Sequence, residues 1–306
     1  MINRVRQQLD TYFTGKEEVT RDILICLLSG GHVLLEDVPG VGKTTLAKVL
    51  SRTVGADFGR IQFTPDTLPS DVTGLSIYNA RTGQFDFQQG AVMHNLVLAD
   101  EINRTSPKTQ ASLLEAMAEG QVTVEGKVHP LGDPFMVIAT QNPVEFVGTY
   151  PLPEAQLDRF MMRLSLGYPK SEAEVEMTRR NLEGFAMDSV EPVCTLSDIL
   201  RMKEEVAKVN VSDKLLLYIQ QICDLTRQEE SFVMGASPRA GVFMALAARA
   251  LAYMEGRDFV KPDDVKAVCV NVLHHRLSLT SREKIRKTDI DSLLRSLMLK
   301  VKVPME

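Results

Sequence analysis

The sequence lacks the features of membrane-spanning, secreted and disulfide-stabilised proteins. No apolar run approaches the roughly 18 to 20 residues that a bilayer span requires, and the segment Met1–Gln7 has no apolar core of a secretory signal. Only four cysteines are present, with no CxxC pair and no histidine at metal-ligand spacing, which argues against a zinc site and a disulfide framework. We therefore expect a cytoplasmic protein whose thiols, at positions 26, 194, 223 and 269, are reduced and mostly buried.

A surplus of positive charge is also missing. Lysine and arginine number 35 against 40 aspartates and glutamates, which gives a formal net charge of −5 and a pI near 5.7. Nucleic acid is therefore not an expected partner, although an acidic protein can still contain a local basic channel. The composition that remains, 44% hydrophobic and 25% charged over 306 residues, is that of a globular protein with one or two packed cores.

The first half of the chain alternates β-rich runs with helical patterns, which predicts a parallel sheet with crossover helices. Continuous apolar runs at 96–99 and 135–139 indicate strands that are covered on both faces. Two further pairs of β-rich runs, at 76–87 and 122–129, flank glycine-containing turns and predict β-hairpins that project from the core. The five strands of the sheet are expected at 32–36, 59–63, 96–100, 135–140 and 162–165.

Helix signals replace the β-runs after residue 168. Ser171 with Glu174 and Thr195 with Asp198 have the spacing of capping boxes, and the serines at 212 and 237 are candidate N-caps. Pro238 then stands at the first helical position of a long pattern that Gly256 ends. We predict an α/β domain at 1–168 and an all-α domain at 169–306.

A phosphate-binding loop is the first motif with chemical meaning. The strand at 32–36 is followed by a glycine-containing turn and at once by a helix pattern, which is the context in which backbone N–H groups wrap phosphates at a helix N-terminus. Lys43 would reach the outer phosphates of ATP, and the Thr44 hydroxyl would ligate Mg²⁺. Asp37 stands where the usual pattern has glycine, but we expect the loop to fold, because the wrapping amides come from later residues. The predicted nucleotide-binding residues are Pro39, Gly40, Val41, Gly42, Lys43, Thr44 and Thr45; the alternative is an ordinary turn.

Two other strand ends carry polar residues. Asp100 and Glu101 end the apolar strand at 96–100, where Asp100 would hold the Mg²⁺ shell and Glu101 would act as the base that orients water. Asn142 ends the strand at 135–140, at the edge where open α/β sheets place ligands, and could bond the γ-phosphate or the water. Taken alone, each motif is also compatible with a surface turn.

Five segments in this order are similar to the MoxR family of AAA+ ATPases: LEDVPGVGKT at 35–44, FTPDTLPSDVTG at 63–74, ADEINR at 99–104, ATQNP at 139–143 and EAQLDRF at 154–160. The resemblance runs from about Gly15 to the C-terminus. One departure is Lys16, where the family commonly has glutamine. The implied fold is a P-loop AAA+ core, with a five-stranded parallel sheet flanked by helices, followed by an all-α lid domain.

The resemblance also implies roles for residues that spacing alone does not single out. Asn142 resembles the sensor 1 residue, Arg159 stands at the arginine-finger position, and Arg239 resembles sensor 2 at the start of a lid helix. Without the resemblance, Arg159 and Arg239 would be taken as surface ion-pair partners. The two hairpins match inserts that would face a ring opening or a partner, with plain surface elaboration as the alternative.

The expected function is ATP hydrolysis to ADP and phosphate, coupled to chaperone-like remodelling of a client. The family implies self-assembly into a ring, with a hexamer as the expected state, and clients that include von Willebrand factor A domain proteins. Two rivals stay open: a nucleotide-switched binding module with little hydrolysis, and a nucleic-acid-directed AAA+ motor. His274 and His275 are expected at a solvated helix end rather than in a metal site.

Overall fold

The computed structural model describes residues 1–142, 148–182 and 187–304. It contains two compact units, each built from segments that are separate in sequence. The first comprises Met1–Arg21, His32–Leu152 and Leu164–Leu200; the second comprises Asp22–Gly31, Pro153–Arg163 and the chain from Arg201 onward. These units interleave along the chain, whereas the sequence predicts two consecutive domains that meet after residue 168. That domain boundary stays a prediction.

A five-stranded parallel sheet forms the α/β core, as the sequence predicts. Its order is β2-β5-β8-β1-β9, and β5 pairs in parallel with β2 and β8, as β8 does with β1. The observed bounds differ from the expected ones by at most one residue at either end. The strands are β1 (Val33–Glu36), β2 (Phe58–Gln62), β5 (Leu96–Asp100), β8 (Met136–Gln141) and β9 (Met162–Leu164).

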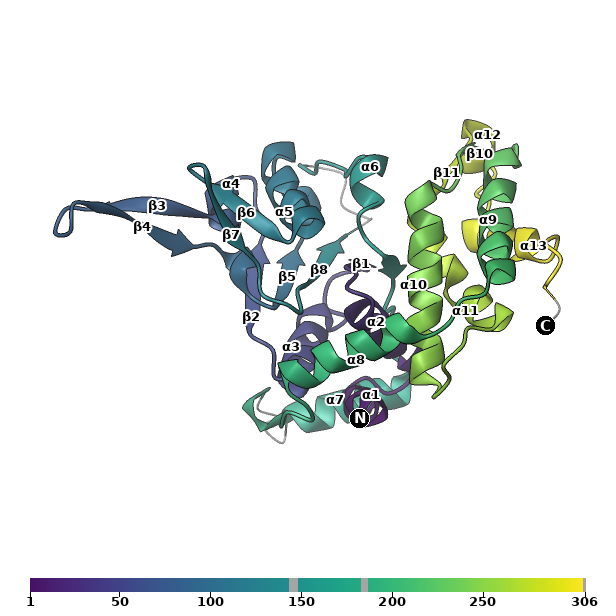
Figure 1. The fold of residues 1–306 in the computed structure, drawn as a ribbon, viewed down its shortest axis with the longest axis horizontal. Coiled ribbons are helices and arrows are strands. Elements are labelled where there is room, and N and C mark those ends of the chain that lie inside the picture. The colour runs from purple at the N-terminus through teal and green to yellow at the C-terminus, as the bar shows by residue number, and fades with distance from the viewer. Residues whose placement is uncertain (143–147, 183–186, 305–306) are drawn as a thin grey trace. The chain divides into compact units, whose positions relative to one another are not determined.

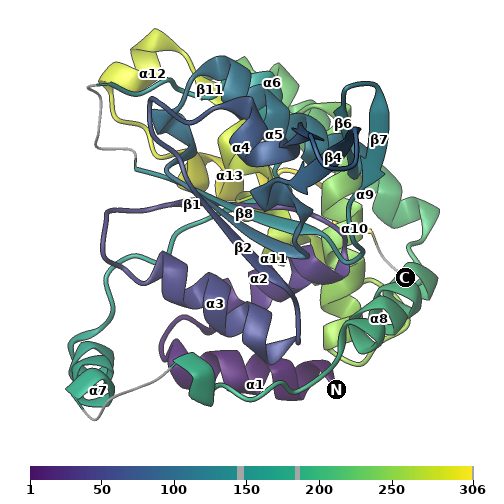
Figure 2. The same cartoon turned by 90° about the vertical axis from the view of Figure 1, so that its left-hand side faces the viewer.

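Helices cover both faces of this sheet. Helix α3 (Lys43–Thr53) lies on one face with α1 (Ile2–Tyr12) packed against it, and α4 (Pro69–Thr73) and α5 (Pro107–Glu119) lie on the other (Figures 1 and 2). Strands β5 and β8 are therefore buried except at their last residue. This confirms the expectation drawn from their continuous apolar runs.

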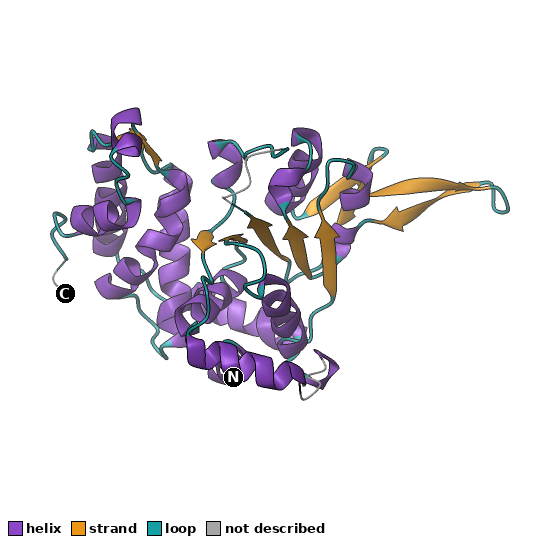
Figure 3. Cartoon of the chain, turned by 180° about the vertical axis from the view of Figure 1, so that it is seen from behind, coloured by secondary structure: helices purple, strands orange, loops and turns teal. Residues whose placement is uncertain are grey.

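The two predicted hairpins are present and touch one another. Strands β3 (Gly74–Asn79) and β4 (Gln84–Gln89) form the longer one, and β6 (Gln121–Val124) and β7 (Lys127–Pro130) the shorter one (Figure 3). The rings of Phe87 on β4 and His129 on β7 stack with their centroids 3.8 Å apart. The remaining elements of the first unit are α7 (Ser171–Leu182) and three 3₁₀ turns at Ala91–Met93, Ile102–Arg104 and Met187–Ser189.

The second unit is mostly helical. Its helices are α6 (Glu154–Leu157), α9 (Asp213–Gln228), α10 (Pro238–Met254), α11 (Pro262–Leu273), α12 (Ser281–Ile285) and α13 (Ile290–Met298), while α2 (Glu17–Leu28) and α8 (Leu196–Lys208) are divided between the units. A 3₁₀ turn, His274–Arg276, follows α11. Ser212 and Ser237 cap their helices through bonds from Leu215 N and Ala240 N, as predicted.

The helical fold predicted for this region is confirmed, with one short addition: β10 (Phe232–Met234) and β11 (Ser278–Leu279) pair as an antiparallel ribbon. The run Phe-Val-Met has only three residues, which is too short for a sequence pattern to identify it as a strand. Its partner, β11, follows the 3₁₀ turn. Over the described ranges, no helix has both the length and the apolarity of a membrane span.

Candidate active site

The predicted phosphate loop connects β1 to α3. Strand β1 ends at Glu36, and α3 begins at Lys43 with Gly42 as its N-cap. Gly40 and Gly42 have φ values of 84° and 94°, in the left-handed region where a side chain would be strained, and a β-carbon on Gly40 would meet nothing within 4 Å. The first amides of α3 have no partner within the helix, so they are available to an anion.

Asp37 anchors the start of this loop. Its carboxylate, 5% exposed, accepts hydrogen bonds from Leu166 N (2.7 Å), Gly167 N (2.9 Å) and Ser165 Oγ (2.7 Å), all in the segment that follows β9. The loop therefore folds with aspartate in the place of the usual glycine, as expected, and the carboxylate ties it to a neighbouring segment. No local pattern indicates that second role, because Asp37 and Gly167 are 130 residues apart.

Lys43 lies close to the acidic residues of the site. Its ammonium donates a hydrogen bond to the Asp37 carbonyl (2.9 Å). Burial lowers the pKa of Lys43 from its usual value, while the negative charges of Asp37, Asp100 and Glu101 act in the opposite direction. Lys43 begins the helix after β1, and Asp100 and Glu101 stand at the end of β5, so the predicted phosphate-binding lysine and carboxylate pair lie at the same edge of the sheet.

Thr140 joins Asp100 to Glu101. The buried Thr140 hydroxyl on β8 donates to Asp100 Oδ1 (2.7 Å) and accepts from Glu101 N (2.9 Å). Arg60 on β2 donates to the other Asp100 oxygen, Oδ2, at 2.7 Å. Because β2, β5 and β8 are adjacent and parallel, their carboxyl ends meet at one edge, which fixes the Asp100 carboxylate from two sides.

Glu101 is held from both sides. It adopts a left-handed backbone conformation with φ of 59°, and such a non-glycine residue often marks a functional position. Its Oε2 accepts from Gln62 Nε2 (3.0 Å) and pairs with Arg104 Nε (3.2 Å). Arg60, Gln62 and Thr140 were not predicted from the sequence. Gln62 and Thr140 are polar side chains near the carboxyl end of a strand next to β5, which is a usable signal, whereas Arg60 is in the middle of β2 and has none.

Asn142 lies at the same edge of the sheet. It directly follows β8, is 6% exposed, and comes next to Gln141, which pairs in register with Glu36 at the end of β1. Pro143, quoted with it in the sequence motif, lies outside the described residues. The sheet therefore brings the phosphate loop, the carboxylate pair and Asn142 together.

A pocket of about 300 Å³ adjoins the phosphate loop within the first unit. The loop contributes Gly40, Val41, Gly42 and Thr45, and apolar side chains dominate the rest of its wall. Lys16 also lines it and donates to the Tyr168 carbonyl (2.9 Å). The other lining residues are Tyr12, Phe13, Thr14, Leu166, Gly167, Pro169, Ala173, Glu176, Met177 and Met187.

These features fit a nucleotide with magnesium. The open glycine turn and the α3 amides suit phosphates, and the apolar pocket beside them suits a flat base. In the described part of the chain, no group of three or more His, Cys, Asp or Glu side chains could hold a metal alone. The predicted ligands, the Thr44 hydroxyl and the Asp100 carboxylate, are oxygen donors of the kind that suit Mg²⁺, which is commonly bound by one or two protein ligands together with substrate phosphates.

Known proteins resemble this chain over its whole length. A profile of the ATPase family associated with various cellular activities (AAA) matches residues 32–162, and one of the AAA lid domain matches 224–295. The uncharacterized protein YeaC of Bacillus subtilis (strain 168) is 47% identical over 306 residues, which cover 100% of this chain and 96% of YeaC. Chaperone MoxR1 of Mycobacterium tuberculosis is 42% identical over 91% of this chain and 76% of its own length. The chain belongs to the MoxR family of AAA+ ATPases.

A crystal structure shows the same fold. A suspected ATPase from Cytophaga hutchinsonii is 39% identical and superposes with a TM-score of 0.92 over 99% of this chain and 95% of its own. The five-stranded sheet and the helical lid are therefore those of a solved structure. Two relatives named protein MoxR, from Methylorubrum extorquens and Paracoccus denitrificans, align at 26% and 28% identity.

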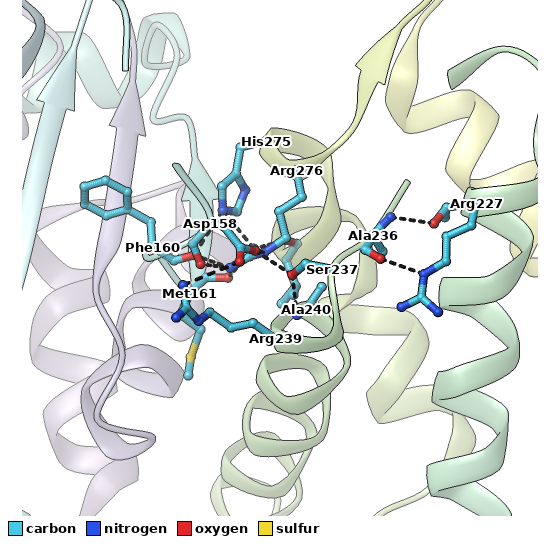
Figure 4. A network of polar contacts seen from close by, with 12 residues as sticks. Asp158, Phe160, Met161, Arg227, Ala236, Ser237, Arg239, Ala240, His275 and Arg276 are labelled. Atoms are coloured by element: carbon cyan, nitrogen blue, oxygen red, sulfur yellow. Dashed lines mark hydrogen bonds and ion pairs between the residues drawn. The ribbon is translucent and has the colours of Figure 1, made fainter. Parts of the chain in front are cut away.

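The two predicted arginines of this MoxR-family protein lie in the second unit. Arg159 comes two residues after α6 and directly follows Asp158. Arg239 is the second residue of α10, has a side chain 49% exposed, and places Nη1 3.5 Å from Asp158 Oδ2 (Figure 4). The residue beside the predicted finger thus contacts the predicted sensor 2.

The expectation for the histidine pair is wrong. His275 is 8% exposed, and burial with the charge of Arg276 lowers its pKa well below the usual value, so its ring is neutral. His274 is half-buried and its Nδ1 contacts Asp291. The 3₁₀ turn after α11 draws this helix end inward, which the helical pattern could not reveal.

Proposed function

We propose that this MoxR-family protein hydrolyses ATP to ADP and phosphate at the edge of its parallel sheet. The observation that carries the proposal is that the phosphate loop after β1 and the Asp100-Glu101 pair at the end of β5 lie at the same edge of the parallel sheet, on either side of β8. A phosphate-loop cation beside a carboxylate pair is the arrangement that phosphoryl transfer to water requires.

Each side chain has a separate task in this proposal. The amides of residues 40–45 and the Lys43 ammonium bind the phosphates, with Pro39 and Val41 shaping the turn. Thr44 and Asp100 would hold Mg²⁺, which neutralises charge on the phosphate oxygens when bound. Glu101 orients the attacking water and takes up its proton. Asn142 holds the water or the γ-phosphate in line.

The position of Glu101 suggests control over the base. The contacts with Gln62 and Arg104 hold the Glu101 carboxylate beside β2. These two residues therefore set the position from which Glu101 acts on the water. Thr140 fixes the main chain at the same point, because it bonds Glu101 N. The base is thus held by groups from both neighbouring strands, β2 and β8, and from the turn that follows it.

Assembly and client action extend the proposal. Arg159 would supply a cation to the γ-phosphate on a neighbouring copy, in a ring that is a hexamer, and Arg239 would act as sensor 2. Hydrolysis would then move the lid, proposed at 169–306, against a client such as a von Willebrand factor A domain protein. The name of the Mycobacterium relative, a chaperone, supports this class of work, which we place in the cytoplasm.

Lys43→Ala tests the binding step. We expect ATP affinity in the presence of Mg²⁺ to fall about 10- to 100-fold by calorimetry, because a charge-assisted hydrogen bond contributes about 1.5–3 kcal/mol. Lys48→Ala is the matched control: Lys48 is an exposed lysine on the same helix, α3, and its loss should leave affinity unchanged. Equal affinities for the two variants would remove Lys43 from the site.

A further inference from the structure

Arg276 is a buried cation in the second unit. Its side chain is 1% exposed, and burial lowers its pKa to about 10, below the usual arginine value. A buried guanidinium is tolerated only when its charge is paired and its donors are satisfied. Nε donates to Asp158 Oδ1 at 2.8 Å, and the guanidinium lies over the Phe243 ring, 5.1 Å from its centroid.

The other donors of Arg276 hold main-chain carbonyls. Nη2 donates to Asp158 O (3.1 Å) and Phe160 O (2.5 Å), and Nη1 donates to Met161 O (3.2 Å) (Figure 4). These three carbonyls lie on both sides of Arg159. One guanidinium therefore fixes the backbone from which the Arg159 side chain departs.

Nη1 has one further acceptor, near the end of α11, and one close neighbour on the turn that carries Arg276. It donates to Val272 O and lies 2.8 Å from His275 Nε2. Both hydrogens of Nη1 are used on Met161 O and Val272 O, and His275 Nε2 donates to Phe160 O (3.0 Å), so the neutral ring adds no second charge beside the guanidinium. The Arg276 side chain is thus held both by α11, through Val272, and by the segment 158–161.

Asp158 extends the same framework to α10. Its Oδ1 also accepts from Ser237 Oγ (2.8 Å), and Ser237 is the N-cap of the helix that begins Pro238-Arg239. The second oxygen of Asp158 meets Arg239 only at 3.5 Å, and the Arg239 side chain is half-exposed. Arg239 can therefore move toward an anion while Arg276 still neutralises Asp158.

We propose that Arg276 is a positioning residue for Arg159: it holds the main chain at residues 158, 160 and 161, so that the finger points from a fixed frame into the neighbouring site. This inference rests on the proposed function, in which Arg159 acts on the γ-phosphate of another copy. A lid ion pair with a purely structural role would contribute stability without affecting turnover.

Arg276→Lys separates these two roles. Lysine keeps the charge beside Asp158 but lacks the fork that reaches three carbonyls. We expect kcat for ATP to fall about 100-fold, which is the order of loss that a displacement of a catalytic group by about 1 Å causes, while ATP affinity by calorimetry stays within about twofold.

Arg257→Lys is the matched control. Arg257 donates to both oxygens of Asp264 (2.8 and 2.6 Å), with side chains 19% and 8% exposed, and neither residue touches Asp158 or Arg159 in the structure. Both variants lose a paired guanidinium in the same unit, and both should melt at a lower temperature. Only Arg276→Lys should lose turnover; an equal loss in both, or in neither, overturns the proposal.

ATP turnover by assemblies that mix two variants is a second measurement, and a change in stability alone does not alter its expected outcome. Arg276→Lys keeps its own phosphate loop, whereas Lys43→Ala keeps its own finger. Mixing them should therefore raise ATP turnover above the sum of the separate activities, at sites that pair the first variant's loop with the second variant's Arg159. No gain on mixing contradicts a role that acts through the finger.

Two controls keep the outcomes distinct. If Arg276→Lys does not fold, Asp158→Asn replaces it, since asparagine keeps the shape and weakens the same framework. If wild-type protein hydrolyses no ATP, or Lys43→Ala hydrolyses it normally, the proposed function fails. If Lys43→Ala is inactive and both framework variants retain wild-type kcat, this inference fails alone.

Discussion

Replacing Asp37 with alanine should loosen the phosphate loop from the segment after β9. The carboxylate accepts three hydrogen bonds, of which the one from Leu166 N is buried and those at Ser165 and Gly167 are more exposed. Hydrogen bonds to charged groups contribute about 1.5–3 kcal/mol each to stability, and exposed bonds contribute less because water competes for them. We therefore expect a local loss of about 2–4 kcal/mol, which corresponds to a factor of about 30 to 1,000 in the opening equilibrium.

Amide hydrogen exchange measures this loss where it occurs. The Leu166 and Gly167 amides should exchange at least about 30-fold faster in Asp37→Ala than in the wild type, while β5 and β8 keep their protection. Asp71→Ala is the control, because Asp71 accepts a single exposed bond from Leu68 N (2.8 Å) at the start of α4. A change of less than about threefold at both amides in Asp37→Ala would refute the anchoring role.

Two other variants test the site and the core. Thr140→Val should raise the Mg²⁺ concentration needed for half-maximal turnover by several-fold, because the bond to Asp100 is lost, whereas Thr140→Ser should not; metal titrations measure both. His32 accepts from Val137 N at Nδ1 (3.0 Å), and burial lowers its pKa to about 4. In the unfolded chain His32 becomes protonated below about pH 6.5, whereas in the folded chain it stays neutral down to about pH 4. The free energy of unfolding therefore falls as the pH is lowered through this range, by up to about 3 kcal/mol. Urea titrations at several pH values should show a smaller loss in His32→Gln than in wild type, because buried His275 still contributes a loss of the same sign.

The sheet and its hairpins could be predicted because their signals are local. A continuous apolar run defines β5 and β8 whatever surrounds them, and a glycine-containing turn between β-rich runs defines each hairpin. The phosphate loop was likewise predictable, because a strand, a glycine turn and a helix follow one another without a gap. Each of these features is complete within about fifteen residues.

Pairings between distant segments were not predictable. The bonds of Asp37 to Leu166 and of Arg276 to Phe160 join residues more than 100 positions apart. The sequence of one segment does not indicate which distant segment it contacts. The strand order that places Gln62 beside Glu101 is a similar case, since it depends on which strands pair. The burial of His275 was missed because its polarity suggested solvent, whereas its ring bonds to the Phe160 carbonyl, which is 115 residues away in sequence.

Turnover by Glu101→Gln tests the central claim most directly. Glutamine keeps the shape of the side chain and removes the carboxylate that would take the proton, so ATP should bind with near wild-type affinity by calorimetry. Phosphate release should nevertheless fall by about 100-fold or more, as general-base losses do. Glu115→Gln, a change at an exposed residue of α5, should leave release unchanged. Wild-type phosphate release by Glu101→Gln would contradict the assignment of this sheet edge as the site of hydrolysis.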